Sequence, residues 1–181
     1  VSDPSGSISY TYTPQGQVAS QISALPAGGS QFVAYTYDGM GRLTGIGNSG
    51  GVGIGYGYAS GRLITVTATI DGVASNIVTN LHYQPFGATT GWTWGNGLTR
   101  NLSYDLDGRL VELGSGNGGV DLQRLTYGYD DADRMTVLTN HANTSLSQAY
   151  HYDALARLTS VTAIGANQSF AWDPNGNRSS H

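Results

Sequence analysis

The sequence predicts an all-β protein, an array of strand–turn–strand repeats that form a large antiparallel sheet. Three observations predict this fold. A short motif with two aromatic residues recurs along the whole chain. Glycine makes up 27 of the 181 residues, whereas lysine is absent and glutamate occurs once, so residues that favour helices are scarce. Charged residues amount to only 11%, against about a quarter in an ordinary soluble domain.

The recurring motif is an aromatic residue, any residue, and a second aromatic residue; we call the two aromatic positions the first and second slots. The motif begins near residues 10, 35, 56, 81, 102, 127, 150 and 170, at spacings of 20 to 25 residues. All 12 tyrosines occupy slots, and the other four slots hold Leu81, Leu102, Phe170 and Trp172. A period of this length is typical of stacked structural units. Residues 1–181 are therefore expected to be a single array of about eight repeats.

Each repeat is expected to open with a strand, because side chains two residues apart lie on one face of a strand and the slots have this spacing. The residue between the slots is small or polar and suits the opposite face. Asp and Gly then predict a turn, with Asp38-Gly39 and Asp107-Gly108 as two-residue hairpin turns. The chain resumes as a strand, best seen at 63–70. Two strands per repeat give on the order of sixteen strands.

The apolar residues that follow the turn leave one point open. Leu43 and Ile46, and likewise Leu110 and Leu113, are three residues apart. That separation places them on opposite faces of a regular strand. Either a β-bulge restores a shared face, or the strand is buried on both sides.

The residues expected to maintain the repeat are the slot aromatics, the turn Asp and Gly, and the Arg-Leu pair after the turn. The arginines near the turns are expected to stack on a neighbouring aromatic ring or to pair with the Asp of an adjacent turn. These arginines are Arg42, Arg62, Arg109, Arg134, Arg157 and Arg178. The predicted structural residues are Tyr35, Tyr37, Asp38, Gly41, Arg42, Leu43, Tyr56, Tyr58, Arg62, Tyr104, Asp105, Gly108, Arg109, Leu110, Tyr127, Tyr129, Asp130, Tyr150, Tyr152, Asp153, Arg157 and Leu158.

The repeated pattern YxYDxxGRL resembles the YD-repeat, or RHS-repeat, family over about residues 8–180. Its clearest copies are 35–43, 104–110 and 150–158, and 92–105 is similar to an RHS core segment. The resemblance implies a curved sheet that is part of a spiral β-shell. Such shells enclose toxic domains in bacterial polymorphic toxins and insecticidal toxin complexes, and a related barrel serves adhesion in animal teneurins. Because those shells have many more repeats, this chain is expected to be part of one.

The repeats that begin at 10, 81 and 170 show departures from the family pattern that bear on their turns. The repeats at 10 and 81 lack the Asp and the Gly-Arg-Leu, and a proline after each slot pair (Pro14, Pro85) predicts an altered turn or a sheet edge. In the last repeat, Asp173 and Pro174 are followed by Asn175, Gly176 and Asn177. The family's self-cleavage motif has Leu in place of Asn177, so we interpret this segment as another repeat.

The residues that could act in catalysis or bind a metal form no recognisable site. The histidines (His82, His141, His151, His181) lack metal-ligand spacing, and the Asp-rich turns lack the ligands of a calcium loop. We expect no catalytic residue, cofactor or metal. Trp92 and Trp94 share a strand face near Tyr83 and Phe86; they either stack on sugars or fill the core of a divergent repeat.

The leading functional hypothesis is a non-catalytic segment of an RHS-type β-shell that encloses or supports another polypeptide, such as a toxin cargo. The alternative is a carbohydrate- or cell-surface-binding module that uses exposed aromatics, and a remote third is a hydrolase that uses turn carboxylates. The expected partners are the rest of the shell, the enclosed polypeptide, a glycan in the alternative, and a second copy through unpaired sheet edges.

Charge and hydropathy limit the other partners and the location. The net charge of −4 argues against a nucleic-acid surface, and no apolar run reaches the about 18 residues of a membrane helix. The N-terminus has no signal peptide and no Met, which suggests an excised piece. The resemblance implies a secreted or cell-surface location within a larger bacterial protein.

Overall fold

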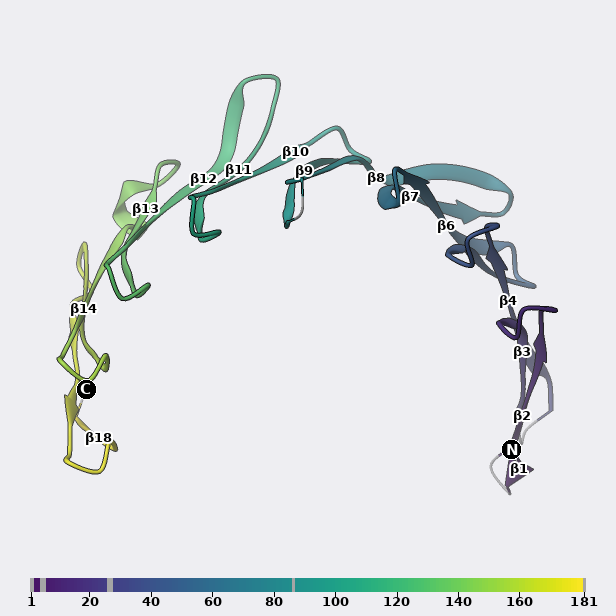
Figure 1. The fold of residues 1–181 in the computed structure, drawn as a ribbon, viewed down its shortest axis with the longest axis horizontal. Coiled ribbons are helices and arrows are strands. Elements are labelled where there is room, and N and C mark those ends of the chain that lie inside the picture. Colours follow the sequence, from purple (N-terminus) through teal and green to yellow (C-terminus); the bar gives the residue numbers. More distant parts are fainter. Residues whose placement is uncertain (1, 4–5, 26–27, 86, 181) are drawn as a thin grey trace. The chain divides into compact units, whose positions relative to one another are not determined.

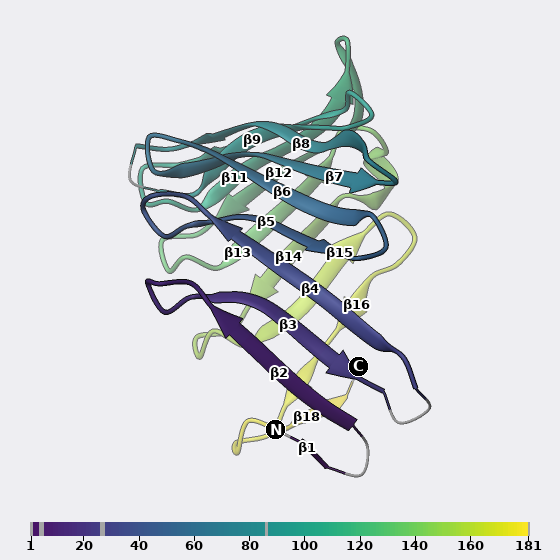
Figure 2. The same ribbon diagram turned by 90° about the vertical axis from the view of Figure 1, so that its right-hand side faces the viewer.

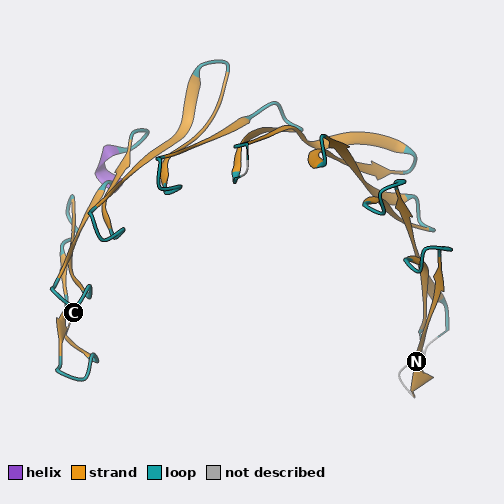
Figure 3. Cartoon of the chain, viewed as in Figure 1, coloured by secondary structure: helices purple, strands orange, loops and turns teal. Residues whose placement is uncertain are grey.

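The structure is a computed structural model that describes residues 2–3, 6–25, 28–85 and 87–180; Phe86 and His181 lie outside the described residues. Nearly all of the described chain is strand or turn (Figure 3). Its one helical element is a single 3-10 turn, η1, at Thr144–Leu146. The prediction of an all-β protein is confirmed. No helix in the described residues is long and apolar enough to cross a membrane.

The chain divides into two compact units, of which the first comprises residues 1–82 and 92–96. From β1 to β8 each strand pairs antiparallel with the next in chain order (Figures 1 and 2). The strands are β1 (Ser2–Asp3), β2 (Gly6–Tyr12), β3 (Val18–Ala24), β4 (Ser30–Tyr37), β5 (Leu43–Asn48), β6 (Val52–Ala59), β7 (Arg62–Ile70), nearly all of β8 (Val73–Tyr83) and the second half of β9 (Thr89–Trp94).

The second unit comprises residues 83–91 and 97–181. From β10 to β16 the strands again pair antiparallel in chain order, and β17 pairs with β18. The strands are β10 (Thr99–Tyr104), β11 (Leu110–Asn117), β12 (Val120–Tyr129), β13 (Met135–Asn140), β14 (Gln148–Tyr152), β15 (Leu158–Ala163), β16 (Gln168–Ser169), β17 (Ala171–Trp172) and β18 (Arg178–Ser180). The predicted large antiparallel array is therefore confirmed.

The turns that follow Tyr37 and Tyr104 have three loop residues, so the prediction of two-residue turns at Asp38-Gly39 and Asp107-Gly108 was wrong. The N–H of Asp38 donates to the carbonyl of Arg42, and the N–H of Gly41 donates to the carbonyl of Asp38. Gly41 has φ +79° and Gly108 has φ +81°, the left-handed conformation that follows a type I turn in such loops. Glycine is favoured there because it has no Cβ.

Proline fits these turns, so of the two alternatives predicted for the repeats at 10 and 81, an altered turn or a sheet edge, the altered turn was wrong. Thr13 and Gln84 make the same two backbone hydrogen bonds as Asp38. The N–H of Thr13 donates to the carbonyl of Gln17, and the carbonyl of Thr13 accepts from the N–H of Gly16. Gln84 is bonded in the same way to Ala88 and Gly87. Proline after the first turn residue suits a type I turn, because its fixed φ matches that position.

A β-bulge resolves the spacing of the apolar residues. Tyr37 lies opposite Leu43 and Thr36 lies opposite Gly45, which leaves Thr44 as an extra residue. The bulge restores Leu43 and Ile46 to one face, opposite Tyr37 and Tyr35. A register shift before the second slot recurs in seven of the hairpins in the described chain.

The two faces of the first unit differ in chemistry. One row of cross-strand neighbours on β4 to β7 is Tyr35, Ile46, Ile54 and Ala68, and we call its side the aromatic face. The adjacent row points to the opposite side, the small-residue face, because side chains alternate along a strand. That row is Thr36, Gly45, Gly55 and Thr67.

The described residues of the two units form no hydrophobic core. No hydrophobic side chain among the described residues is buried. The accessible surface is 11600 Å², whereas a compact monomer of 19.0 kDa exposes about 8,400 Å². The excess of about 3,000 Å² arises because no second layer covers the sheets.

Candidate functional site: the turn locks

The polar residues of each repeat gather at its turn. We define a turn lock as the Asp that opens the turn, the Arg four residues later, and the second-slot aromatic of the next repeat, and we name each lock by its Asp. In the Asp38 lock, Asp38 Oδ1 accepts from the N–H groups of Met40 at 2.9 Å and Arg42 at 3.0 Å, and Oδ2 accepts from Arg42 Nε at 2.8 Å. Both carboxylate oxygens are thus engaged within the turn.

These hydrogen bonds change the acidity of the turn carboxylates. The Arg42 backbone N–H is the largest cause that lowers the pKa of Asp38, and the guanidinium adds to it. The same causes lower the pKa of Asp130 and of Asp153. Burial tends to raise the pKa of Asp105, but the hydrogen bonds from Arg109 outweigh it and the net shift is downward. The turn aspartates are therefore ionised at neutral pH.

Each lock arginine lies over the second-slot ring of the next repeat. The Cζ of Arg42 is 4.4 Å from the centroid of the Tyr58 ring. A cation over an aromatic face is attracted by the quadrupole of the ring. The other pairs are Arg109 over Tyr129 at 5.1 Å, Arg134 over Tyr152 at 5.0 Å and Arg157 over Trp172 at 5.8 Å.

The same second-slot residue donates a hydrogen bond to the preceding repeat. Tyr58 OH donates to the carbonyl of Leu43 at 2.8 Å, directly after the arginine that covers its ring. Burial raises the pKa of Tyr129, which keeps its hydroxyl a proton donor. The other bonds are Tyr37 to Val18, Tyr104 to Thr89, Tyr129 to Leu110, Tyr152 to Met135 and Trp172 Nε1 to Leu158, at 2.8 to 3.1 Å.

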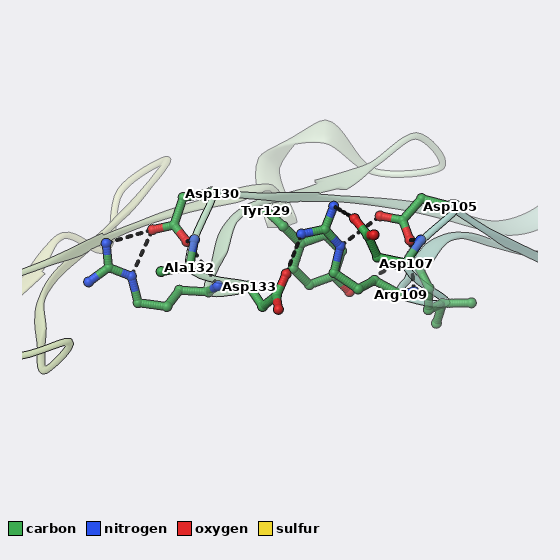
Figure 4. A network of polar contacts seen from close by, with 9 residues as sticks. Asp105, Asp107, Arg109, Tyr129, Asp130, Ala132 and Asp133 are labelled. Carbon is green, nitrogen blue, oxygen red and sulfur yellow. Dashed lines mark hydrogen bonds and ion pairs between the residues drawn. The ribbon is translucent and has the colours of Figure 1, made fainter.

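The guanidinium groups also reach the next turn. Arg134 Nη1 donates to the Asp153 carbonyl at 3.3 Å, and Arg157 Nη1 donates to the Asp173 carbonyl at 3.2 Å. Arg109 instead pairs with the Asp133 carboxylate at 2.5 Å (Figure 4). The ion pair expected with an adjacent turn thus occurs at Arg109, and all four lock arginines pair with the Asp of their own turn.

The remaining predicted repeat residues occupy defined places around the locks. Tyr35, Tyr56, Tyr127 and Tyr150 fill first slots and are half-buried, and Tyr150 OH donates to Gln148 Oε1 at 2.6 Å. Leu110 and Leu158 lie opposite second-slot tyrosines, as Leu43 does. Arg62 opens β7 after the two-residue turn of Ser60 and Gly61.

Arg178 occupies a different position from the other turn arginines. Asn177 stands four residues after Asp173 and donates from Nδ2 to Asp173 Oδ2 at 3.0 Å. Arg178 follows it, lies opposite Trp172 and has its Cζ 5.7 Å from the Phe170 ring, a first slot of the same repeat. The last repeat therefore closes its turn with an amide.

Sequence reasoning missed Gln17 as a lock residue. Gln17 Nε2 donates to the Gly41 carbonyl at 2.7 Å, so it bridges to the next turn as the arginines do. The signal was present, because Gln17 follows Tyr12 by the same five residues that separate Arg42 from Tyr37.

The residues considered for ligand binding lie apart from the locks. Trp92 and Trp94 pack edge to face, with ring centroids 5.4 Å apart at 83°, and Trp94 is 37% exposed. His82 and His151 are exposed on strands, while His141 Nε2 lies 3.0 Å from Thr126 Oγ1. The described residues contain no group of three metal-ligating side chains.

Comparison with known proteins gives structural matches only. No family model matches the sequence, and no curated protein matches it. The fold is similar to a crystal structure of TcdB2-TccC3-Cdc42, with 20% identity and a TM-score of 0.82 over 96% of this chain. It is similar to TcdB2-TccC3 alone (21% identity, TM-score 0.80, 93% of this chain) and to the Photorhabdus luminescens Tc holotoxin pore with a substituted TccC3 (21%, 0.82, 96%).

The chain spans 11% of the length of each of these matched chains. The matched chains carry an RHS/YD-repeat shell, so the expected resemblance is confirmed in the fold. The fold of this chain is that of a segment of such a shell.

Proposed function

We propose that this chain is a non-catalytic wall segment of an RHS-type β-shell that encloses or supports another polypeptide, such as a toxin cargo. In this proposal residues 1–181 act as a single repeat array, and the direct partners are the rest of the parent shell and the enclosed polypeptide. The parent is a larger bacterial protein that is secreted or displayed at the cell surface. The similarity to segments of Tc toxin chains supports this function.

The observation that carries the proposal is the absence of a core in the described residues. Both faces of an uncovered sheet are accessible, and the surface exceeds that of a compact monomer by about 3,000 Å². A wall has this property, because one face meets the enclosed volume and the other meets the outside. The locks supply the cohesion that a core supplies elsewhere.

The use of the carboxylates supports a non-catalytic role. A general acid or base needs a carboxylate that is free to meet a substrate. In the Asp38, Asp105, Asp130 and Asp153 locks, Oδ1 accepts two backbone N–H groups and Oδ2 accepts an arginine. These groups are committed to the turns.

Face-specific labelling tests the wall function, and the chain is suited to it because it contains no cysteine. Thr67→Cys places a thiol on the small-residue face, and Ala68→Cys places one on the aromatic face of the same strand, β7. In the isolated chain both thiols are expected to react with a polar maleimide. In the assembled parent protein one is expected to react much faster than the other. Equal labelling of both faces in the assembled parent would contradict an enclosing wall.

A carbohydrate-binding function is the second candidate, favoured only by the exposure of Trp94. Its expected signature is a change in tryptophan fluorescence on glycan addition that Trp94→Ala removes. The matched control is Tyr12→Ala, which removes an aromatic side chain that is 61% exposed. A fluorescence spectrum unchanged across a glycan panel would exclude this candidate.

A further inference from the structure

We propose that each turn lock is closed by the repeat that follows it, so that the second-slot aromatic is a positioning residue for the turn of the preceding repeat. This inference goes beyond the wall function, because it assigns a direction to the array. It rests on the origin of the atoms that hold each lock arginine.

The Asp105 lock shows this origin (Figure 4). Asp105 and Arg109 belong to one repeat and share an ion pair of 2.7 Å. The ring under the guanidinium belongs to Tyr129, which also donates to the Leu110 carbonyl, and the acceptor beyond the guanidinium is Asp133. The ring, the donor and the outer acceptor all come from the following repeat.

The next two locks repeat the arrangement. In the Asp130 lock, Tyr152 supplies the ring and the hydroxyl, and the Asp153 carbonyl is the outer acceptor for Arg134. In the Asp153 lock, Trp172 supplies the ring and the indole N–H, and the Asp173 carbonyl accepts from Arg157. The direction is the same at every step.

The exceptions follow the same rule. In the Asp38 lock the next repeat supplies the ring and hydroxyl of Tyr58, but its two-residue turn has no Asp. Arg42 Nη1 is buried and makes no hydrogen bond within the described chain. The final turn closes with Asn177, whose short amide reaches Asp173 within the same repeat.

A planar guanidinium held at its edge by one carboxylate can still rotate and move sideways. A ring on its face and an acceptor beyond it restrict that motion, and the turn that carries the arginine becomes more rigid. A second-slot aromatic that only supported its own hairpin would instead affect its own turn. The two accounts therefore predict changes in different repeats.

The test is amide hydrogen exchange of the full chain carrying Tyr129→Phe, which removes one hydroxyl. The exchange of the Gly108 and Arg109 amides, in the preceding turn, is expected to rise about fivefold, the factor that corresponds to one net hydrogen bond. The exchange of the Asp133 and Arg134 amides, in its own turn, is expected to change less than twofold. Equal changes in both turns, a change confined to its own turn, or no change would each overturn the proposal.

Two matched variants complete the design. Tyr152→Phe is expected to move the effect by one repeat, to the amides of Asp133 and Arg134. Tyr127→Phe removes a first-slot hydroxyl that makes no hydrogen bond within the described residues. The amides of Gly108 and Arg109 and those of Asp133 and Arg134 are therefore expected to keep their exchange rates. If Tyr152→Phe affects the same amides as Tyr129→Phe, the one-repeat displacement is wrong.

Discussion

The indole Nε1 of Trp172 donates to the carbonyl of Leu158 at 2.8 Å, in the place where tyrosine hydroxyls donate in five other repeats. The only second slot without tyrosine thus keeps an aromatic ring with a polar donor at its far end. The repeat requires both properties in one residue, which explains why phenylalanine occurs in a first slot but in no second slot.

Replacement of Trp172 tests this requirement. Trp172→Tyr is expected to retain most of the stability, because the hydroxyl can donate to Leu158. Trp172→Phe is expected to lower the free energy of unfolding by about 1 kcal/mol relative to Trp172→Tyr, since a net hydrogen bond is lost. Urea unfolding of the two variants measures the difference. Equal midpoints would mean that the donor contributes nothing.

The third loop residue of the turns provides a test of backbone strain. Gly108 has φ +81°, whereas Ala156 occupies the same position with φ +61°. A Cβ at Gly108 meets no atom within 4 Å, so Gly108→Ala costs only the strain of the left-handed conformation, about 1 kcal/mol. Ala156→Gly relieves that strain but adds entropy to the unfolded chain. Its free energy of unfolding is therefore expected to be unchanged or to rise by up to about 1 kcal/mol. Thermal unfolding that shifts in the same direction for both variants would contradict this account.

The turn aspartates predict sensitivity to acid. Hydrogen bonds led by the arginine backbone N–H lower the pKa of Asp38, Asp130 and Asp153 in the folded chain. The unfolded chain, with carboxyl pKa values of about 3.9, therefore binds more protons in acid. The resulting stabilisation is fully present above the unfolded pKa and is lost as the pH falls through the lowered folded values.

Urea midpoints measured between pH 7 and pH 2.5 check the acid prediction, and the midpoint is expected to fall below about pH 4. The variant Asp38→Asn, with one titrating group fewer, is expected to show a weaker dependence on pH whatever its stability at neutral pH. A midpoint constant over this range would show that the locks do not depend on ionised carboxylates.

Uncovered sheets and edges predict association of the isolated chain. Unpaired edge strands offer backbone donors and acceptors to another copy, and the bare faces add apolar surface. Multi-angle light scattering is expected to show a mass that rises with concentration. A compact monomer with fully protected terminal strands would contradict the prediction.

The sequence was sufficient to predict the repeat and the positions of its turns, because both depend on local spacing, but it did not predict the number of residues in each loop. Slots two residues apart place Tyr35 and Tyr37 on one face whatever the rest of the chain does. The bulge at Thr44 remained open, since a separation of three residues between Leu43 and Ile46 fits a bulge or a doubly buried strand. Only the register of β4 against β5 distinguishes them.

The partners of each lock were harder to predict. Whether Arg42 meets Tyr37 or Tyr58 depends on how loops of different lengths set one repeat against the next, and no local pattern encodes that. The Asp–Arg pair four residues apart is visible in the sequence, but its assignment to one turn is not, because Asp-Gly predicts a two-residue loop where the structure has three loop residues. Arg178 was misplaced because Asn177 precedes it in the arginine position.

The coupling between Arg134 and Tyr152 tests most directly the claim that slot aromatics join neighbouring repeats. A double-mutant cycle with Arg134→Ala and Tyr152→Leu, measured by urea unfolding, is expected to give a coupling energy of about 0.5–1 kcal/mol. The control cycle pairs Arg134→Ala with Tyr104→Leu, because the ring of Tyr104 lies under no part of the Asp130 lock. The two substitutions are expected to be additive within about 0.3 kcal/mol. Additivity in the Arg134–Tyr152 cycle as well would contradict the account.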